Sequence, residues 1–166
     1  MHRMTEDNEK AAFAGESQAH MRYRIFAAVA AKQFPNVARL FRAVASAEES
    51  HATNHLRVLR GVGSTAENLE VAIAGESFEV EVMYPAYGAV AELQGEKSAL
   101  RAIHWAEEAE KVHAALYKQA REAVAAGKDV ELGVVYVCGA CGYTGVGEVP
   151  DKCPLCGAAK DKFQTF

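Results

Sequence analysis

Several residue types are scarce in this 166-residue chain, and their scarcity excludes several classes of protein. Aromatic residues make up 8% of the sequence, only four prolines occur, and no cysteine stands before position 138. Positive charge is not in excess either, because 22 acidic residues outnumber 18 basic ones and give a net charge of -4. This composition argues against a disordered or collagen-like chain, and against binding to nucleic-acid phosphates or to an anionic membrane surface.

Long apolar runs are missing as well. No uninterrupted hydrophobic segment approaches the roughly 20 residues that a membrane-spanning helix needs. The first residues are polar and lack the apolar stretch of a secretory signal. We therefore expect a cytoplasmic protein whose partners include neither nucleic acid nor a membrane.

The segment up to about residue 126 is rich in Ala, Glu, Lys and Leu, with apolar residues at alternating steps of three and four. This is the period of amphipathic helices. The predicted helices cover approximately residues 7–33, 36–60, 64–95 and 96–126. We expect them to form a four-helix bundle within residues 1–130, followed by a small β and loop domain in residues 131–166.

Local signals fix the helix ends. Asn36 is the expected N-cap of the second helix, and Gly61 is expected to take the left-handed conformation after it. The spacing of Ser64 and Glu67 predicts a capping box at the start of the third helix, which should end near Gly95, while the fourth stops at Gly127. Pro85 should kink the third helix without ending it.

All four cysteines lie in the last 29 residues as two Cys-x-x-Cys pairs: Cys138, Cys141, Cys153 and Cys156. In a chain without a secretory signal, this pairing indicates a four-thiolate metal site more than two disulfides. Both iron and zinc accept such a site. So small a domain buries little apolar surface, and the metal should supply much of its folding free energy.

Each predicted helix also has acidic residues on its apolar face, and two of the helices add a histidine there. These residues are Glu16; Glu48 with His51; Glu76 with Glu79; and Glu110 with His113. Carboxylates buried together need positive charge between them. The five glutamates sum to -5, and either two ferrous ions or two ferric ions with one oxo bridge supply +4. One glutamate from each of two helices plus Glu-x-x-His from the other two is the pattern of ferritin-like di-iron bundles.

An internal repeat supports this interpretation. Residues 13–19, FAGESQA, match residues 73–79, IAGESFE, and a Glu-x-x-His motif follows 32 residues after Glu16 and 34 residues after Glu76. The repeat predicts a pseudo-two-fold site with one metal near each half. Glu79 corresponds to Ala19, so the second half offers an extra carboxylate that allows ligand exchange between oxidation states.

The segments that carry a family resemblance are AGESQA, EESH, AGESFEVEVMYP, EKVH and CGACGY…CPLCGAAKDKF. Through them the chain resembles the rubrerythrin family over nearly its whole length. The resemblance implies a ferritin-like bundle with two irons, oxo- or hydroxo-bridged when oxidised, fused to a rubredoxin-like domain with one Fe(Cys)4 centre. By position, it assigns as ligands of the oxidised pair Glu16, Glu48, Glu76, Glu79, Glu110 and His113. His51 would replace Glu79 on one iron upon reduction, and Tyr23 and Tyr84 would supply hydrogen bonds or protons nearby.

The implied activity is the reduction of hydrogen peroxide to water in oxidative-stress defence, with electrons from rubredoxin or an NAD(P)H-dependent reductase passing through the Fe(Cys)4 centre. We expect a homodimer in which one subunit's cysteine domain serves the other's di-iron site, because that domain should lie too far from the ligands of its own chain. The alternatives are ferritin-like iron oxidation or storage, and a metal-binding protein with a structural zinc ribbon.

Overall fold

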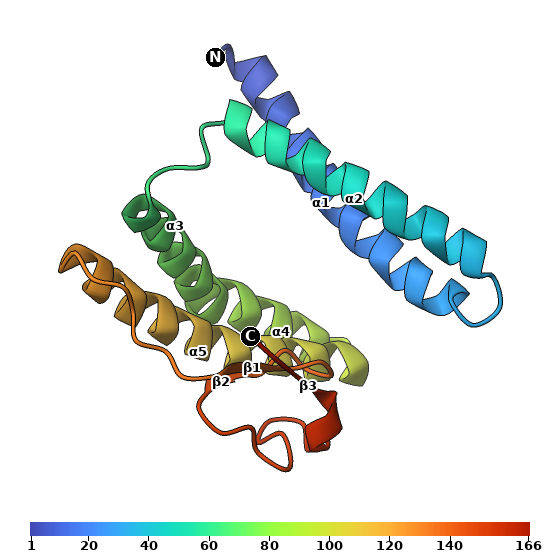
Figure 1. The fold of residues 1–166 in the computed structure, drawn as a ribbon, viewed down its shortest axis with the longest axis vertical. Coiled ribbons are helices and arrows are strands. Elements are labelled where there is room, and N and C mark those ends of the chain that lie inside the picture. The colour runs from blue at the N-terminus through green and yellow to red at the C-terminus, as the bar shows by residue number, and fades with distance from the viewer. The chain divides into compact units, whose positions relative to one another are not determined.

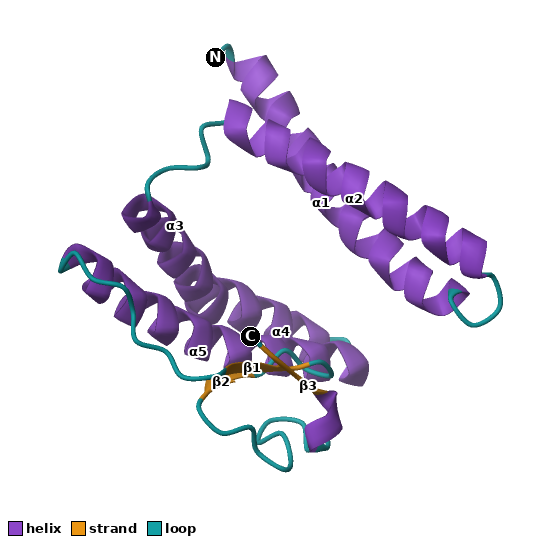
Figure 2. Ribbon diagram, in the orientation of Figure 1, coloured by secondary structure: helices purple, strands orange, loops and turns teal.

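The computed structural model describes residues 1–166 and contains a helical region followed by a small sheet (Figures 1 and 2). The α-helices are α1 (Arg3–Ala30), α2 (Pro35–Val58), α3 (Thr65–Phe78), α4 (Tyr84–Leu93) and α5 (Lys97–Ala125). The strands are β1 (Val135–Cys138), β2 (Thr144–Val146) and β3 (Phe163–Thr165). This order confirms the expected fold class. None of the helices is both long enough and apolar enough to span a bilayer.

The chain divides into two compact units, residues 1–63 and residues 64–166. The first unit is a hairpin of α1 and α2 (Figure 1). Its buried residues are all small: Ala19, Ala27, Ala38, Ala45 and Ala52. Because alanine adds little bulk, the two helix backbones pack closely along their length.

The ends of α2 differ from the sequence expectation. The helix begins at Pro35, and Asn36 lies inside its first turn instead of capping it. Proline suits this position because the first N–H groups of a helix have no intrahelical partner. At the other end, Arg60 and not Gly61 takes the left-handed conformation, with φ of 56°. A Cβ at Gly61 would meet Cδ1 of Leu56, at the flexible end of that side chain.

The second unit begins with the predicted capping box, in which Ser64 and Glu67 bond each other's backbone N–H groups. The expected helix ends near Gly95 and Gly127 are also confirmed, because these glycines adopt φ of 71° and 70°. The first helix ends at Ala30 instead of the expected residue 33. The third predicted helix is interrupted before Pro85, because a π-helical turn, Glu79–Met83, separates α3 from α4. Proline lacks the N–H that a continuous helix would need there.

The π-helical turn explains a difference between the two halves of the sequence repeat. Tyr23 follows Glu16 by seven residues, whereas Tyr84 follows Glu76 by eight. A π-turn accommodates one residue more than an α-helix does. The extra residue in Glu79–Met83 therefore returns Tyr84 to the helix face that Tyr23 occupies in the first half.

The cysteine region folds as a three-stranded antiparallel sheet with strand order β2-β1-β3, plus a short 3-10 helix at Lys160–Lys162. Tyr136 of β1 is buried and meets Phe163 edge-on, with ring centroids 5.4 Å apart. Gly145 is the register partner of Tyr136 on β2. A Cβ at Gly145 would lie 2.4 Å from the Tyr136 ring.

Substitution of Gly145 by alanine should therefore destabilise the sheet. Overpacking of this kind costs about 1 to 3 kcal/mol. We expect faster hydrogen exchange at the amides of β1 and β2 in Gly145→Ala. Gly133→Ala is the matched control, because the nearest atom to its Cβ would be 3.8 Å away. Equal exchange rates in the two variants would contradict the packing role assigned to Gly145.

Candidate metal centres

The helix hairpin brings together three of the predicted ligands, Glu16 from α1 and Glu48 and His51 from α2. One ligand atom of each lies within 4.8 Å of the others. His51 Nδ1 is 2.8 Å from Glu48 Oε2, as the Glu-x-x-His spacing places them one helical turn apart. We call these three residues the first cluster.

The second unit contains a cluster of the same composition, formed by Glu76 of α3 with Glu110 and His113 of α5. His113 Nδ1 lies 2.5 Å from Glu110 Oε2 and 3.9 Å from Glu76 Oε2. These three residues are the second cluster. The neighbouring Glu107 and Glu108 are not part of it, because both form ion pairs with Lys111.

The second cluster concentrates negative charge away from water. Burial first, and then a hydrogen bond with Glu110 and the charges of Glu110 and Glu79, together raise the pKa of Glu76 to about 7. Burial and the charge of Glu110 also raise the pKa of Glu79. Carboxylates and an imidazole that converge in this way fit a bound divalent cation, which would neutralise their repulsion.

The two predicted tyrosines differ in their surroundings. The pKa of Tyr84 is raised by burial and then by the charges of Glu79, Glu110 and Glu76, so its hydroxyl stays protonated beside the second cluster. Tyr23 lies within an aromatic group of the hairpin, with ring centroids 6.1 Å from Phe41 and 6.3 Å from Phe26.

The four cysteines form a third centre at one end of the sheet. Cys138 Sγ lies 3.7 Å from Cys156 Sγ, and Cys141 Sγ lies 3.6 Å from Cys153 Sγ. These distances exceed a disulfide bond of about 2.05 Å. They match the edge of about 3.8 Å that a tetrahedron of sulfur atoms has around a metal at 2.3 Å.

Backbone N–H groups favour the thiolate form of Cys153, whereas burial raises the pKa of Cys141 and Cys156 as long as no metal is bound. Burial alone would raise the pKa of Cys153, but hydrogen bonds from the backbone of Cys156 and Leu155 lower it to about 7. A lowered thiol pKa favours the deprotonated sulfur that binds metal. The residues present therefore fit a four-thiolate metal site.

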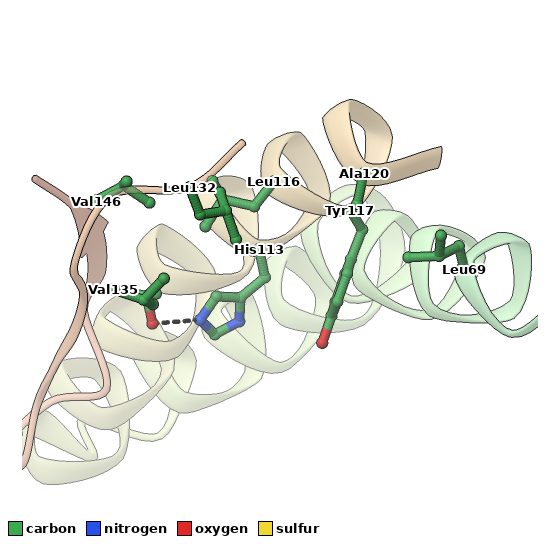
Figure 3. A pocket seen from close by; sticks show the side chains of 9 residues that line it. Leu69, His113, Leu116, Tyr117, Ala120, Leu132, Val135 and Val146 are labelled. Atoms are coloured by element: carbon green, nitrogen blue, oxygen red, sulfur yellow. Dashed lines mark hydrogen bonds between the residues drawn. The ribbon is translucent and has the colours of Figure 1, made fainter. Parts of the chain in front are cut away.

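The cysteine region lies against the second cluster of its own chain, which sequence reasoning did not predict. His113 Nε2 is 2.7 Å from the hydroxyl oxygen of Thr144, three residues after Cys141 (Figure 3, dashed line at His113). Both residues line a largely apolar pocket of about 350 Å³ within the second unit. The expectation that this domain lies too far from the ligands of its own chain is therefore wrong for His113.

Comparison with known proteins gives matches over almost the entire chain. The family model described as Rubrerythrin matches residues 7–121, and that described as the rubredoxin-like domain of rubrerythrin matches residues 136–164. Rubrerythrin-2 of Clostridium acetobutylicum is 43% identical over 178 residues, covering 98% of this chain and 97% of the relative. Nigerythrin of Nitratidesulfovibrio vulgaris is 34% identical over 177 residues, covering 98% and 86%.

Solved structures give the same picture. Nigerythrin in a partially reduced state and nigerythrin in a fully reduced, all-ferrous state both match with a TM-score of 0.57 and 34% sequence identity. Each match covers 98% of this chain and 86% of the nigerythrin chain.

The raised pKa of Glu76 predicts how pH affects the metal-free protein. Its folded-state pKa of about 7 exceeds the ordinary value of 4.5, so the folded state loses stability as pH rises from about 4.5 to about 7. Glu76→Gln removes this loss, and should stabilise the chelator-treated protein by about 1 to 2 kcal/mol at pH 8 and by almost nothing at pH 5. Urea denaturation at the two pH values measures the difference.

Glu92→Gln is the control for this experiment, because Glu92 is exposed on α4. It should change the free energy of unfolding by the same small amount at both pH values. A gain from Glu76→Gln that did not depend on pH would contradict the electrostatic explanation.

Proposed function

The chain belongs to the rubrerythrin family, and from this membership we propose that it is a non-haem di-iron peroxidase that reduces hydrogen peroxide to water. Its cofactors are a di-iron pair held by Glu and His side chains and one iron held by the four cysteines. The observation that supports the activity best is the contact between the cysteine domain and a carboxylate-histidine cluster, through Thr144 and His113. A redox site beside a di-iron ligand suits repeated electron delivery.

The proposal assigns one iron to each cluster. Glu16, Glu48 and His51 would bind the first, and Glu76, Glu110 and His113 the second. Glu79 would complete the oxidised pair, and His51 would take its place on one iron upon reduction. Because the two clusters lie on different compact units, the proposal requires both units to contribute to one site, from a single chain or from the two copies of a homodimer.

Reduction of one peroxide to two waters consumes two electrons and two protons. The reduced iron pair, when bound, supplies the two electrons and polarises the peroxide oxygens. The protein must supply protons and exclude side reactions. Tyr84 remains protonated beside the carboxylates, and Tyr23 is the corresponding residue of the first repeat. Both are proposed to hold or relay protons.

Cys138, Cys141, Cys153 and Cys156 would hold a one-electron iron centre, from which electrons would reach the pair singly. Rubredoxin or an NAD(P)H-dependent reductase is the proposed source of those electrons. Iron storage is disfavoured, since it has no need of a four-thiolate centre in contact with a carboxylate cluster. A structural zinc ribbon would leave the pair without this supply.

The activity is tested by mixing anaerobically reduced protein with hydrogen peroxide in a stopped-flow spectrometer. We expect two electrons consumed per peroxide, with rapid recovery of ferric-thiolate absorbance. Slow iron uptake without peroxide consumption would indicate storage, and a colourless protein would indicate zinc at the cysteines. Either result contradicts the proposed peroxidase.

Two neighbouring glutamates on α5 provide a matched pair of variants. Glu110→Ala removes a proposed iron ligand and should lower both di-iron content and peroxide reduction by about 100-fold or more, since even residues behind metal ligands contribute 10- to 100-fold. Glu108→Ala removes only an exposed carboxylate paired with Lys111, and should leave both near the unmodified level. Similar losses in the two variants would contradict the ligand assignment.

A further inference from the structure

Thr144 is buried, with 7% of its surface exposed, whereas the side chains of the second cluster are only partly buried. It lies on β2, opposite Val137 of β1. A buried hydroxyl has to satisfy its hydrogen-bonding groups within the protein. Both partners of Thr144 are known, namely the carbonyl oxygen of Gly142 at 3.1 Å and His113 Nε2 at 2.7 Å.

The directions of these two hydrogen bonds follow from proton counting. A threonine hydroxyl has one proton to donate and can accept through its oxygen lone pairs. The Gly142 carbonyl can only accept, so the hydroxyl proton is used there. His113 must then donate its Nε2–H to Thr144 Oγ1. In the neutral imidazole this leaves Nδ1 without a proton.

The lone pair of Nδ1 then faces the carboxylates of the second cluster, at 2.5 Å from Glu110 Oε2 and 3.9 Å from Glu76 Oε2. Nitrogen and oxygen lone pairs at such distances repel each other unless a proton or a metal cation lies between them. The tautomer that Thr144 selects is therefore the one able to bind a metal through Nδ1 together with these oxygens.

The corresponding histidine of the first half has no such partner within its own unit. His51 contacts Glu48 through Nδ1, but its Nε2 makes no hydrogen bond within the helix hairpin. The two halves of the repeat therefore hold their histidines differently. His113 is fixed at both ring nitrogens, whereas His51 is held at one.

We propose that Thr144 is a positioning residue for the second iron: its hydroxyl accepts the Nε2 proton of His113, fixes the metal-binding tautomer and ring orientation, and ties the cysteine domain to α5. The inference rests on the proposed role of His113 as an iron ligand. Residues that hold a ligating histidine in this way commonly contribute 10- to 100-fold to metal affinity.

The tautomer can be measured in the full-length protein labelled with 15N-histidine and loaded with Zn(II), which is diamagnetic and accepts the same ligands. Long-range 15N–1H NMR spectra should show His113 protonated at Nε2 and metal-bound at Nδ1. His113→Gln identifies its signals by their loss. If the unmodified protein instead bound zinc through Nε2 of His113, the proposal would be overturned without recourse to any variant of Thr144.

Variants at position 144 measure the contribution of the hydroxyl. Thr144→Val keeps the shape of the side chain without the hydroxyl, and should weaken binding of one Fe(II) of the pair by about 10- to 100-fold. Thr144→Ser retains the hydroxyl and should restore binding. Thr165→Val is the matched control, because Thr165 is exposed on β3 of the same sheet.

The absorbance of the four-thiolate iron serves as a folding check in every variant. Iron binding in Thr144→Val equal to that of the unmodified protein, with this absorbance intact, would overturn the proposal. Loss equal in Thr144→Val and Thr144→Ser would do the same, because shape and not the hydroxyl would then be responsible. If the unmodified protein binds two irons through the expected tautomer but does not reduce peroxide, the proposed function fails while the role of Thr144 stands.

Discussion

The partial burial of carboxylates close to one another is the constraint on which this structure depends. Glu76 shows it most directly, since burial first, and then its neighbours Glu110 and Glu79, raise its pKa to about 7. A protein selected for stability alone would place leucine or alanine at such positions. The acids are tolerable when cations lie between them, so the same groups that weaken the metal-free fold become its stabilising contacts once metal binds.

The repeat allows part of the metal-ligand arrangement to be predicted from the sequence. The Glu-x-x-His motifs sit on one helix face by simple periodicity, and this is enough to predict that Glu48 meets His51 and Glu110 meets His113. The cysteine spacing likewise predicts a compact four-sulfur centre. The capping box at Ser64 and the helix ends at Gly95 and Gly127 can be predicted as well, because they depend on the conformational preferences of residues next to one another in the sequence.

Other features depend on contacts between residues or on comparison of distant segments, and no local sequence pattern predicts them. The end of α2 near Gly61 could be recognised, but Arg60 and not the glycine takes the left-handed conformation there. The π-helical turn at Glu79–Met83 could be inferred only by comparing the spacing of Glu16 to Tyr23 with that of Glu76 to Tyr84. Thr144 carries no signal at all, because its partner His113 lies 31 residues earlier in the chain.

The hydrogen bond between Thr144 and His113 also has a thermodynamic consequence. The sheet that carries Thr144 also carries Cys138, one of the four cysteines that would hold a metal, and the ring of His113 belongs to the second cluster. If a metal bound at the cysteines strengthens this contact and so raises the affinity of the second cluster for its metal, then a metal at the second cluster raises the affinity of the cysteines by the same factor. Linkage between two binding equilibria is reciprocal. Filling the sulfur centre should thus favour filling of the oxygen and nitrogen centre, and cooperative metal uptake follows from a single side-chain contact.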